Sequence, residues 1–333
     1  MPISRLLPAS FEQPNPTNLV INGNMAVSQR GTSSTGITAS GYRSAPDRFR
    51  PSIGTAGTWT ISQSTDVPTG YGFTNSYKFD CTTADASLAV GDDMALQYRF
   101  EGQDVQILKK GTSNAVPVTV SFWVKSTKTG TFILELMDND NAREISKSYT
   151  VSSSNTWEYK TVTFEGDTTG ALDNDTARSL TLQWWLAAGT NWTSGTLNTS
   201  WADPATANRV VGQVNIADST SNDWLLTGVC LNVGSKSISG NDGKSFPHES
   251  YTENLQKCLR YYEISAQSYG LHYSTSNSIM PVPYKVHKRV TPSSSLRNDS
   301  GGGDHGTSNN AGNYAYWTNQ GANTAELIAD AEL

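Results

Sequence analysis

Apolar and polar residues alternate with a period of two along much of the chain, which is the pattern of strands with one buried face. Between Val116 and Val124 every second residue is apolar. Further strand candidates are separated by turn-forming residues and lie at 59–61, 131–137, 157–164, 180–186 and 224–233, with a weaker one at 210–216. Strands that recur without helices between them predict an antiparallel β-sandwich.

A helical pattern stands out after this series. Ser250 and Glu253 have the spacing of a capping box. The apolar residues that follow share one helical face: Leu255, Cys258, Leu259 and Tyr262. We therefore expect a connector helix over 250–265, between a sandwich at 18–249 and a small C-terminal β domain at 266–333.

The two ends of the chain carry weaker patterns. Residues 1–17 contain three prolines and little periodicity, which predicts an extended N-terminal arm. Residues 266–333 contain strand candidates at 270–274, 281–290 and 313–319 but few apolar positions. Because small domains with thin cores need support, we expect this unit to pack against the sandwich or against other copies of the chain.

Composition narrows the class of protein. Charged residues make up 16% of the chain, against about 25% in typical domains, and 9 Trp, 14 Tyr and 9 Phe supply large side chains for a core. This combination excludes long charged helices and disorder. The net charge of −6 argues against nucleic-acid binding. No apolar run approaches the roughly 18 residues of a membrane span, and the N-terminus lacks the apolar core of a secretory signal.

Several segments resemble one family. They are NLVINGNMAVSQRG (18–31), APDRFR (45–50), SFWVKSTKTGTFILEL (121–136), NTWEYKTVTFEGDTTG (155–170), TGVCLNVG (227–234), ESYTENLQKCLRYYE (249–263) and the closing DAEL (330–333). In this order they resemble domains of bacteriophage tail fibres, tail spikes and related virion proteins. The resemblance implies a jelly-roll sandwich akin to carbohydrate-binding modules, in proteins that are frequently trimeric. Ser28 and Phe49 stand where the family usually has Trp, and we expect both in the core.

A cluster of tryptophans offers candidate binding chemistry. Trp184, Trp185, Trp192 and Trp201 fall within a short stretch rich in Asn, Thr and Gly. Adjacent Trp184 and Trp185 must point to opposite faces of a strand. An exposed indole stacks well on a sugar ring, so the candidate glycan-binding residues are Trp185, Trp192, Trp201 and Asn191. The alternative is that the loop folds back and these rings fasten it to the sandwich.

Other candidate chemistry is weaker. Asp138, Asp140, Asp173 and Asp175 have side chains suited to Ca²⁺, but such residues are also common in turns, and we expect no metal and no cofactor. Three separated cysteines form no disulfide or zinc pattern, and Cys230 is expected in the core. The basic run 285–289 is expected on a solvated strand edge.

Catalysis has little support in the sequence. Four scattered histidines and the lack of nucleophile or phosphate-loop motifs predict no enzyme. A carboxylate pair for glycoside hydrolysis stays open, because its spacing is set by the fold.

The favoured function is that of a bacteriophage virion structural protein on the particle exterior, a tail-fibre or spike-like subunit that binds a host-surface glycan. Its expected partners are its own copies, most simply in a homotrimer, and other virion proteins that contact the arm. Two alternatives stay open. One is a head decoration or tail adaptor protein with a purely structural role. The other is a carbohydrate-binding module of a secreted glycan-active protein.

Overall fold

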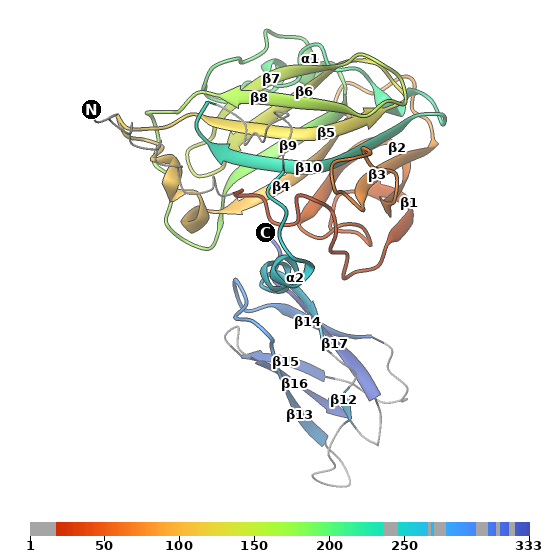
Figure 1. The fold of residues 1–333 in the computed structure, drawn as a ribbon, viewed down its shortest axis with the longest axis vertical. Coiled ribbons are helices and arrows are strands. Elements are labelled where there is room, and N and C mark those ends of the chain that lie inside the picture. Colours follow the sequence, from red (N-terminus) through yellow and green to blue (C-terminus); the bar gives the residue numbers. More distant parts are fainter. Residues whose placement is uncertain are drawn as a thin grey trace, which may run out of the picture.

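The structure is a computed structural model that describes residues 18–235, 246–265, 268–269, 278–297, 306–310, 314–319 and 324–333. The expected arm at 1–17 lies outside the described residues. A large β unit and a smaller one meet at the helix α2 (Tyr251–Leu259), as Figure 1 shows. Among the described residues, no helix is long and apolar enough to cross a bilayer.

The large unit contains ten antiparallel strands. They are β1 (Ser33–Ala39), β2 (Phe49–Ser64), β3 (Ser76–Thr83), β4 (Asp93–Glu101), β5 (Val118–Ser126), β6 (Gly130–Asp138), β7 (Arg143–Val151), β8 (Glu158–Phe164), β9 (Arg178–Ala188) and β10 (Asp223–Val233). Nine of them follow the order β7-β6-β9-β4-β2-β3-β10-β5-β8, and β1 pairs with β2.

The long strand β2 divides this order into two layers. Its first part, from Phe49, pairs with β4, and its last part, to Ser64, pairs with β3. The register of β2 against β4 shifts between Gly54 and Thr55, and Thr55 has a φ of +65°. At Gly57 φ is +72°, and a Cβ there would lie 2.8 Å from the Thr83 carbonyl oxygen, so glycine allows the strand to change direction.

The core lies between the inner faces of the two layers. Trp184 of β9 meets Phe122 of β5 edge to face, with ring centroids 5.8 Å apart, and Phe122 meets Tyr149 of β7 in the same way at 5.1 Å. This packing confirms the predicted all-β class, an antiparallel jelly-roll β-sandwich, and the alternation in β5 and β9. Cys230 is buried as expected.

Two expectations about the sandwich were wrong. Residues 210–216 form no strand, because they belong to a segment that covers the outer face of one layer. Phe49 is buried as predicted, but Ser28 is only half-buried, and its hydroxyl donates to the Gly31 carbonyl oxygen. Ser28 therefore forms a hydrogen-bonded turn instead of filling the core.

The helix α2 begins with the predicted capping box, in which the Ser250 hydroxyl accepts from the Glu253 N–H and the Glu253 carboxylate accepts from the Ser250 N–H. It ends at Leu259, earlier than expected. Tyr262–Ile264 forms strand β11, which pairs with β17 (Thr324–Asp330). The apolar face of α2 buries Cys258 and Leu259.

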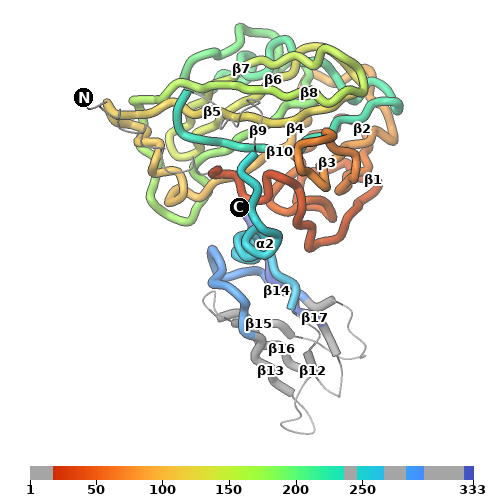
Figure 2. Tube along the Cα trace, in the orientation of Figure 1, coloured from red at the N-terminus to blue at the C-terminus, as the bar shows by residue number. Residues whose placement is uncertain are grey.

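The small unit contains further strands, namely β12 (Ser268–Tyr269), β13 (Ser278–Pro283), β14 (Ser293–Arg297), β15 (Gly306–Asn310) and β16 (Tyr314–Asn319). Of the strands expected here, 270–274 lies outside the described residues, 281–290 is a strand only as far as Pro283, and 313–319 corresponds to β16. The last residues run back beside α2 and the sandwich (Figure 2).

The basic run 285–289 lies at the joint between the units, so its expected place on a strand edge was wrong. Lys288 is fully buried, and its ammonium donates to the Glu263 carboxylate and the Leu259 carbonyl oxygen. Arg289 donates to the backbone oxygens of Ala331 and Glu332. These cations fasten the C-terminal residues to α2, a role that the alternating pattern did not indicate.

Candidate functional site

The two adjacent tryptophans of β9 point to opposite faces, as predicted. Trp184 lies in the sandwich core, and Trp185 lies on the outer face of the layer. Trp185 is nevertheless only 3% exposed, because residues 189–214, here called the covering segment, fold over it. A ligand therefore has no access to the Trp185 ring in this arrangement, which corrects its assignment as a contact residue.

Trp192 lies on top of Trp185 and is partly exposed. The two ring centroids are 5.2 Å apart, with the ring planes tilted by 49°. The Trp192 indole N–H donates to the Gly91 carbonyl oxygen at 3.3 Å. The neighbouring Asn191 is exposed, and its backbone N–H donates to the Val90 carbonyl oxygen at 2.8 Å. Trp192 and Asn191 are thus held on the loop before β4.

Two ionisable groups complete this surface. The Arg209 guanidinium lies 5.2 Å from the Trp192 ring centroid and 5.4 Å from that of Trp185. Burial raises the pKa of Asp93 to about 6, against the opposing effect of Arg209. Val90 is 61% exposed, an unusual exposure for a large apolar residue. We call Val90, Asp93, Asn191, Trp192 and Arg209 the Trp192 patch.

A buried polar network supports the patch from below. Glu135 of β6 is completely buried and accepts from the Trp185 indole at 2.6 Å and from the Arg209 Nε at 2.7 Å. Gln183 also donates to it. Because buried carboxylates are stable only when paired and hydrogen-bonded, these contacts fix the position of the covering segment.

Glu144 of β7 is the second buried carboxyl of this network. Its Oε1 accepts from the Asn198 amide at 2.7 Å, and its Oε2 has no hydrogen-bond partner in the described structure. Burial and the adjacent Glu135 carboxylate raise the pKa of Glu144 to about 9. The raised pKa favours the neutral, protonated form of Glu144 at neutral pH, although Arg209 opposes the shift.

This shift makes stability depend on pH. The unfolded chain releases the Glu144 proton near its ordinary pKa of about 4.3, whereas the folded protein retains it until about pH 9. Stability therefore falls as pH rises through this window. We expect Glu144→Gln to raise the free energy of unfolding at pH 8 by about 1–2 kcal/mol and to flatten its pH dependence.

Denaturant unfolding between pH 5 and pH 9 tests this expectation. Glu165→Gln is the matched control, because the Glu165 side chain is 59% exposed. Parallel pH profiles for wild type and Glu144→Gln would show that Glu144 carries no raised pKa.

Trp201 lies apart from the Trp192 patch. It packs against the sandwich core rather than the outer-face cluster, and its indole N–H donates to the Glu165 carbonyl oxygen at 2.7 Å. The Lys110 ammonium lies 5.1 Å from its ring centroid. The adjoining cavity of about 20 Å³ holds no more than one or two water molecules.

Asp138, one of the acidic residues considered for Ca²⁺, serves a different purpose. Asp138 is fully buried, accepts from the N–H groups of Asp140 and Asn141, and forms an ion pair with Lys110. The Lys110 ammonium also lies 3.1 Å from Asp167. An ammonium thus takes the position where a metal ion would balance these charges. In the described residues, no group of three or more His, Cys, Asp or Glu is arranged to hold a metal.

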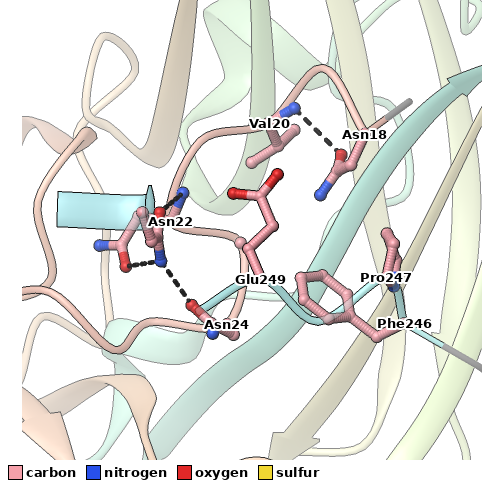
Figure 3. A pocket seen from close by; sticks show the side chains of 9 residues that line it. Asn18, Val20, Asn22, Asn24, Phe246, Pro247 and Glu249 are labelled. Carbon is pink, nitrogen blue, oxygen red and sulfur yellow. Dashed lines mark hydrogen bonds between the residues drawn. The ribbon is translucent and has the colours of Figure 1, made fainter. Parts of the chain in front are cut away.

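A small cavity marks where α2 joins the sandwich, and Figure 3 shows the side chains around it. The Asn18 amide accepts from the Val20 N–H and donates to the Val229 carbonyl oxygen, both at 3.0 Å. Asn254 of α2 donates to Asn24 at 2.9 Å. With a volume of about 10 Å³ the cavity is too small for more than a single water molecule, so we assign it to the joint and not to ligand binding.

The structure thus brings Trp185, Trp192 and Asn191 together and leaves Trp201 elsewhere. Sequence reasoning missed Val90, Asp93, Glu135, Glu144 and Arg209. Glu135 gave a usable signal, since it is a charged residue within the apolar run 131–137. Arg209 gave none, because it reaches Glu135 across 74 positions of sequence.

Comparisons with known proteins give distant matches of structure only. No protein-family model and no curated sequence matches the chain. The enzymatically active domain of tailspike protein 4 of bacteriophage CBA120 is 12% identical, with a TM-score of 0.33, over 65% of this chain and 21% of that chain.

Two carbohydrate-binding modules give similar values. TmCBM61, solved with β-1,4-galactotriose, is 10% identical with a TM-score of 0.33, over 65% of this chain and 99% of its own. The N-terminal cellulose-binding domain of Cellulomonas fimi β-1,4-glucanase C is 13% identical with a TM-score of 0.30, over 63% of this chain and 100% of its own. These values are too low to assign a function.

Proposed function

We propose that this protein is a bacteriophage virion subunit, of tail-fibre or tail-spike type, that binds a saccharide on the host surface through the Trp192 patch. The observation that carries the proposal is the pair formed by half-exposed Trp192 and exposed Asn191. Both are held by hydrogen bonds to the loop before β4.

The chemistry of the patch suits an uncharged saccharide. The Trp192 ring offers an apolar face for the C–H groups of a sugar, and Val90 extends that surface. Asn191 both donates and accepts, while Asp93 accepts and Arg209 donates. Because the covering segment is anchored on Glu135, these groups need little reorganisation on binding, which favours affinity.

The proposed role is binding without catalysis. Glu135 and Glu144 are close carboxyls of the kind that glycosidases use, but both are fully buried below the patch. Glu135 is moreover tied to Arg209, Gln183 and Trp185. Their role is therefore to hold the covering segment in place.

The virion assignment rests on the sequence motifs at 18–31, 45–50, 121–136, 155–170 and 227–234, which occur in the order typical of tail-fibre proteins. A trimer would bring three Trp192 patches to one host surface, and avidity would compensate for weak single-site binding. The arm at 1–17 is proposed to contact other virion proteins.

A carbohydrate-binding module of a secreted glycan-active protein is the second candidate, because it needs the same sandwich and the same patch. The mass of the purified chain in solution, from light scattering, separates the two. A multiple of three supports the tail-fibre role, and a stable monomer supports the binding module. A head decoration or tail adaptor role predicts no saccharide binding.

A microarray of bacterial capsular and O-antigen polysaccharides tests the proposed binding directly. We expect the whole chain to bind at least one polysaccharide, and Trp192→Ala to lose about tenfold or more of that signal, since a stacked aromatic residue dominates small sites of this kind. Trp157→Ala is the matched control, because Trp157 is also half-buried and bonded, through its indole N–H, to Asp66.

Two results would contradict the proposal. One is the absence of any bound polysaccharide, and the other is an equal loss of signal in the Trp157 and Trp192 variants.

A further inference from the structure

A second cleft opens where the β1 strand approaches the small unit. Its volume is about 530 Å³, within the range of small-molecule sites. The sandwich contributes Arg30, Tyr42, Arg43 and Thr35, and the small unit contributes Tyr262 and Ile328. This cleft shares no residue with the Trp192 patch.

Arg43 is the unbalanced cation of this cleft. One of its terminal nitrogens, Nη2, donates to the carbonyl oxygens of Ala39 and Ser40. Its Nε is buried without a hydrogen-bond partner, and in the described part of the chain no carboxylate lies within 4.0 Å of its guanidinium. A guanidinium that lines a cleft and has no carboxylate partner favours the entry of an anion.

Arg30, by contrast, is fully balanced. Its guanidinium lies 3.1 Å from Asp330, 3.3 Å from Glu332 and 3.9 Å from Asp47. It is also stacked 3.6 Å from the Tyr262 ring centroid and lies 5.1 Å from that of Tyr42. Arg30 therefore positions the two rings that flank the cleft, and Arg43 is left to meet a ligand.

Further arginines lie near this cleft, although the whole chain has a net charge of −6. Burial and the adjacent charges of Arg178 and Arg43 lower the pKa of Arg50. Burial and the charges of Arg50 and Arg178 lower the pKa of Arg99 to about 10. Cations that repel one another in this way favour the approach of an anion.

The remaining lining is typical of sugar recognition. Tyr42 supplies aromatic surface and the Thr35 hydroxyl is exposed to the cleft, whereas Tyr262 is buried beneath Arg30 and closes one side of it. A small inorganic anion would use Arg43 but would leave the Tyr42 ring without a contact and most of the cleft empty. A sugar ring that carries a carboxylate would use both Arg43 and the Tyr42 ring.

We propose that this cleft binds an acidic saccharide, with Arg43 receiving the carboxylate and the Tyr42 ring contacting the sugar ring. The inference goes beyond the function proposed above, because it assigns a second site with a different ligand chemistry. A host glycan that contains both neutral and acidic sugars would then be held at two points of each chain.

Calorimetric titration of the whole chain with 3′-sialyllactose and with lactose tests this site. We expect 3′-sialyllactose to bind about tenfold more tightly than lactose, since a charge-assisted hydrogen bond accounts for a factor of this size. Arg43→Gln should lose that preference, and Arg43→Lys should retain part of it. Arg178→Gln is the matched control, because it removes the same charge nearby without altering the lining of the cleft.

The outcomes distinguish this inference from the proposed function. Equal affinities for the two sugars, an Arg43→Gln variant that keeps the preference, or equal losses in the Arg43 and Arg178 variants would overturn the acidic-saccharide site. The loss of array signal in Trp192→Ala would stand whichever of these results were obtained, because it depends on the Trp192 patch and not on this cleft. The acidic-saccharide site would also be overturned if sodium acetate displaced 3′-sialyllactose at the concentration at which 3′-sialyllactose itself binds. Acetate carries a carboxylate but has no sugar ring.

Discussion

Replacing Arg209 with methionine is expected to lower the free energy of unfolding by about 3–5 kcal/mol, because it leaves the buried Glu135 carboxylate without its cation. Arg209 donates to both oxygens of Glu135, at 2.7 and 3.1 Å, and lies 3.4 Å from Glu144. Both glutamates are fully buried. The covering segment should loosen as well, since Arg209 is its main polar anchor.

Urea unfolding at pH 7 measures this effect, and Arg178→Met is the control, because Arg178 is exposed at the start of β9. Adding Glu135→Gln to Arg209→Met should recover part of the loss, since a neutral amide replaces the unpaired charge. A loss below about 0.5 kcal/mol, or no recovery in the double variant, would mean that the network does not hold the covering segment.

Replacing Lys110 with methionine is expected to have an effect of similar size, about 3–5 kcal/mol. The buried Lys110 ammonium pairs with Asp138 and Asp167 and donates to the carbonyl oxygens of Thr169 and Gly170, at 2.8 and 2.9 Å. Asp167 keeps Arg143 as a partner, at 2.7 Å, but among the described residues Asp138 has no other cation within 4.0 Å. The variant therefore leaves one buried charge unpaired.

The neighbouring Lys109 provides the control for this variant. Lys109 is exposed, and replacing it with methionine removes the same charge from the same turn. Thermal unfolding should show a large loss for Lys110→Met and almost none for Lys109→Met. Similar losses for the two would contradict a specific role for the buried ammonium and would reopen the question of a metal ion beside Asp138.

Much of the sandwich was predictable because alternate residues of its strands are apolar and point into the core. The alternation in β5 and β9 identified the strands and placed Trp184 and Trp185 on opposite faces. The capping box likewise located the start of α2. The alternation and the capping box each involve only a few consecutive residues. They can therefore be recognised without knowing which distant segments the residues contact.

The candidate site was predictable only in part, because long-range contacts define it. Trp185 lies in a strand with an apparent outer face, and only the return of the covering segment buries it. The weak alternation at 210–216 indicated a strand, but Val210 instead packs on that face. The burial of Lys288 was likewise not predictable from the sequence around it, because it depends on contacts with Glu263 and Leu259 at the joint.

These contacts connect stability with the proposed function. The Trp192 patch is presented by the covering segment, and this segment is held by Arg209, Glu135 and Trp185. A variant that loosens the network is therefore expected to weaken saccharide binding even though it leaves Trp192 in place. Glu144→Gln, which keeps this position uncharged, should leave binding unchanged.

Contact between Trp192 and the saccharide is what the proposed function requires. Fluorine NMR of the whole chain labelled with 5-fluorotryptophan measures this contact directly, because each of the 9 tryptophans gives its own signal and Trp192→Phe assigns one of them. On addition of the polysaccharide that gives the strongest array signal, we predict that the Trp192 resonance shifts or broadens while that of Trp157 does not. A Trp192 resonance that stays fixed while the polysaccharide binds would contradict the claim.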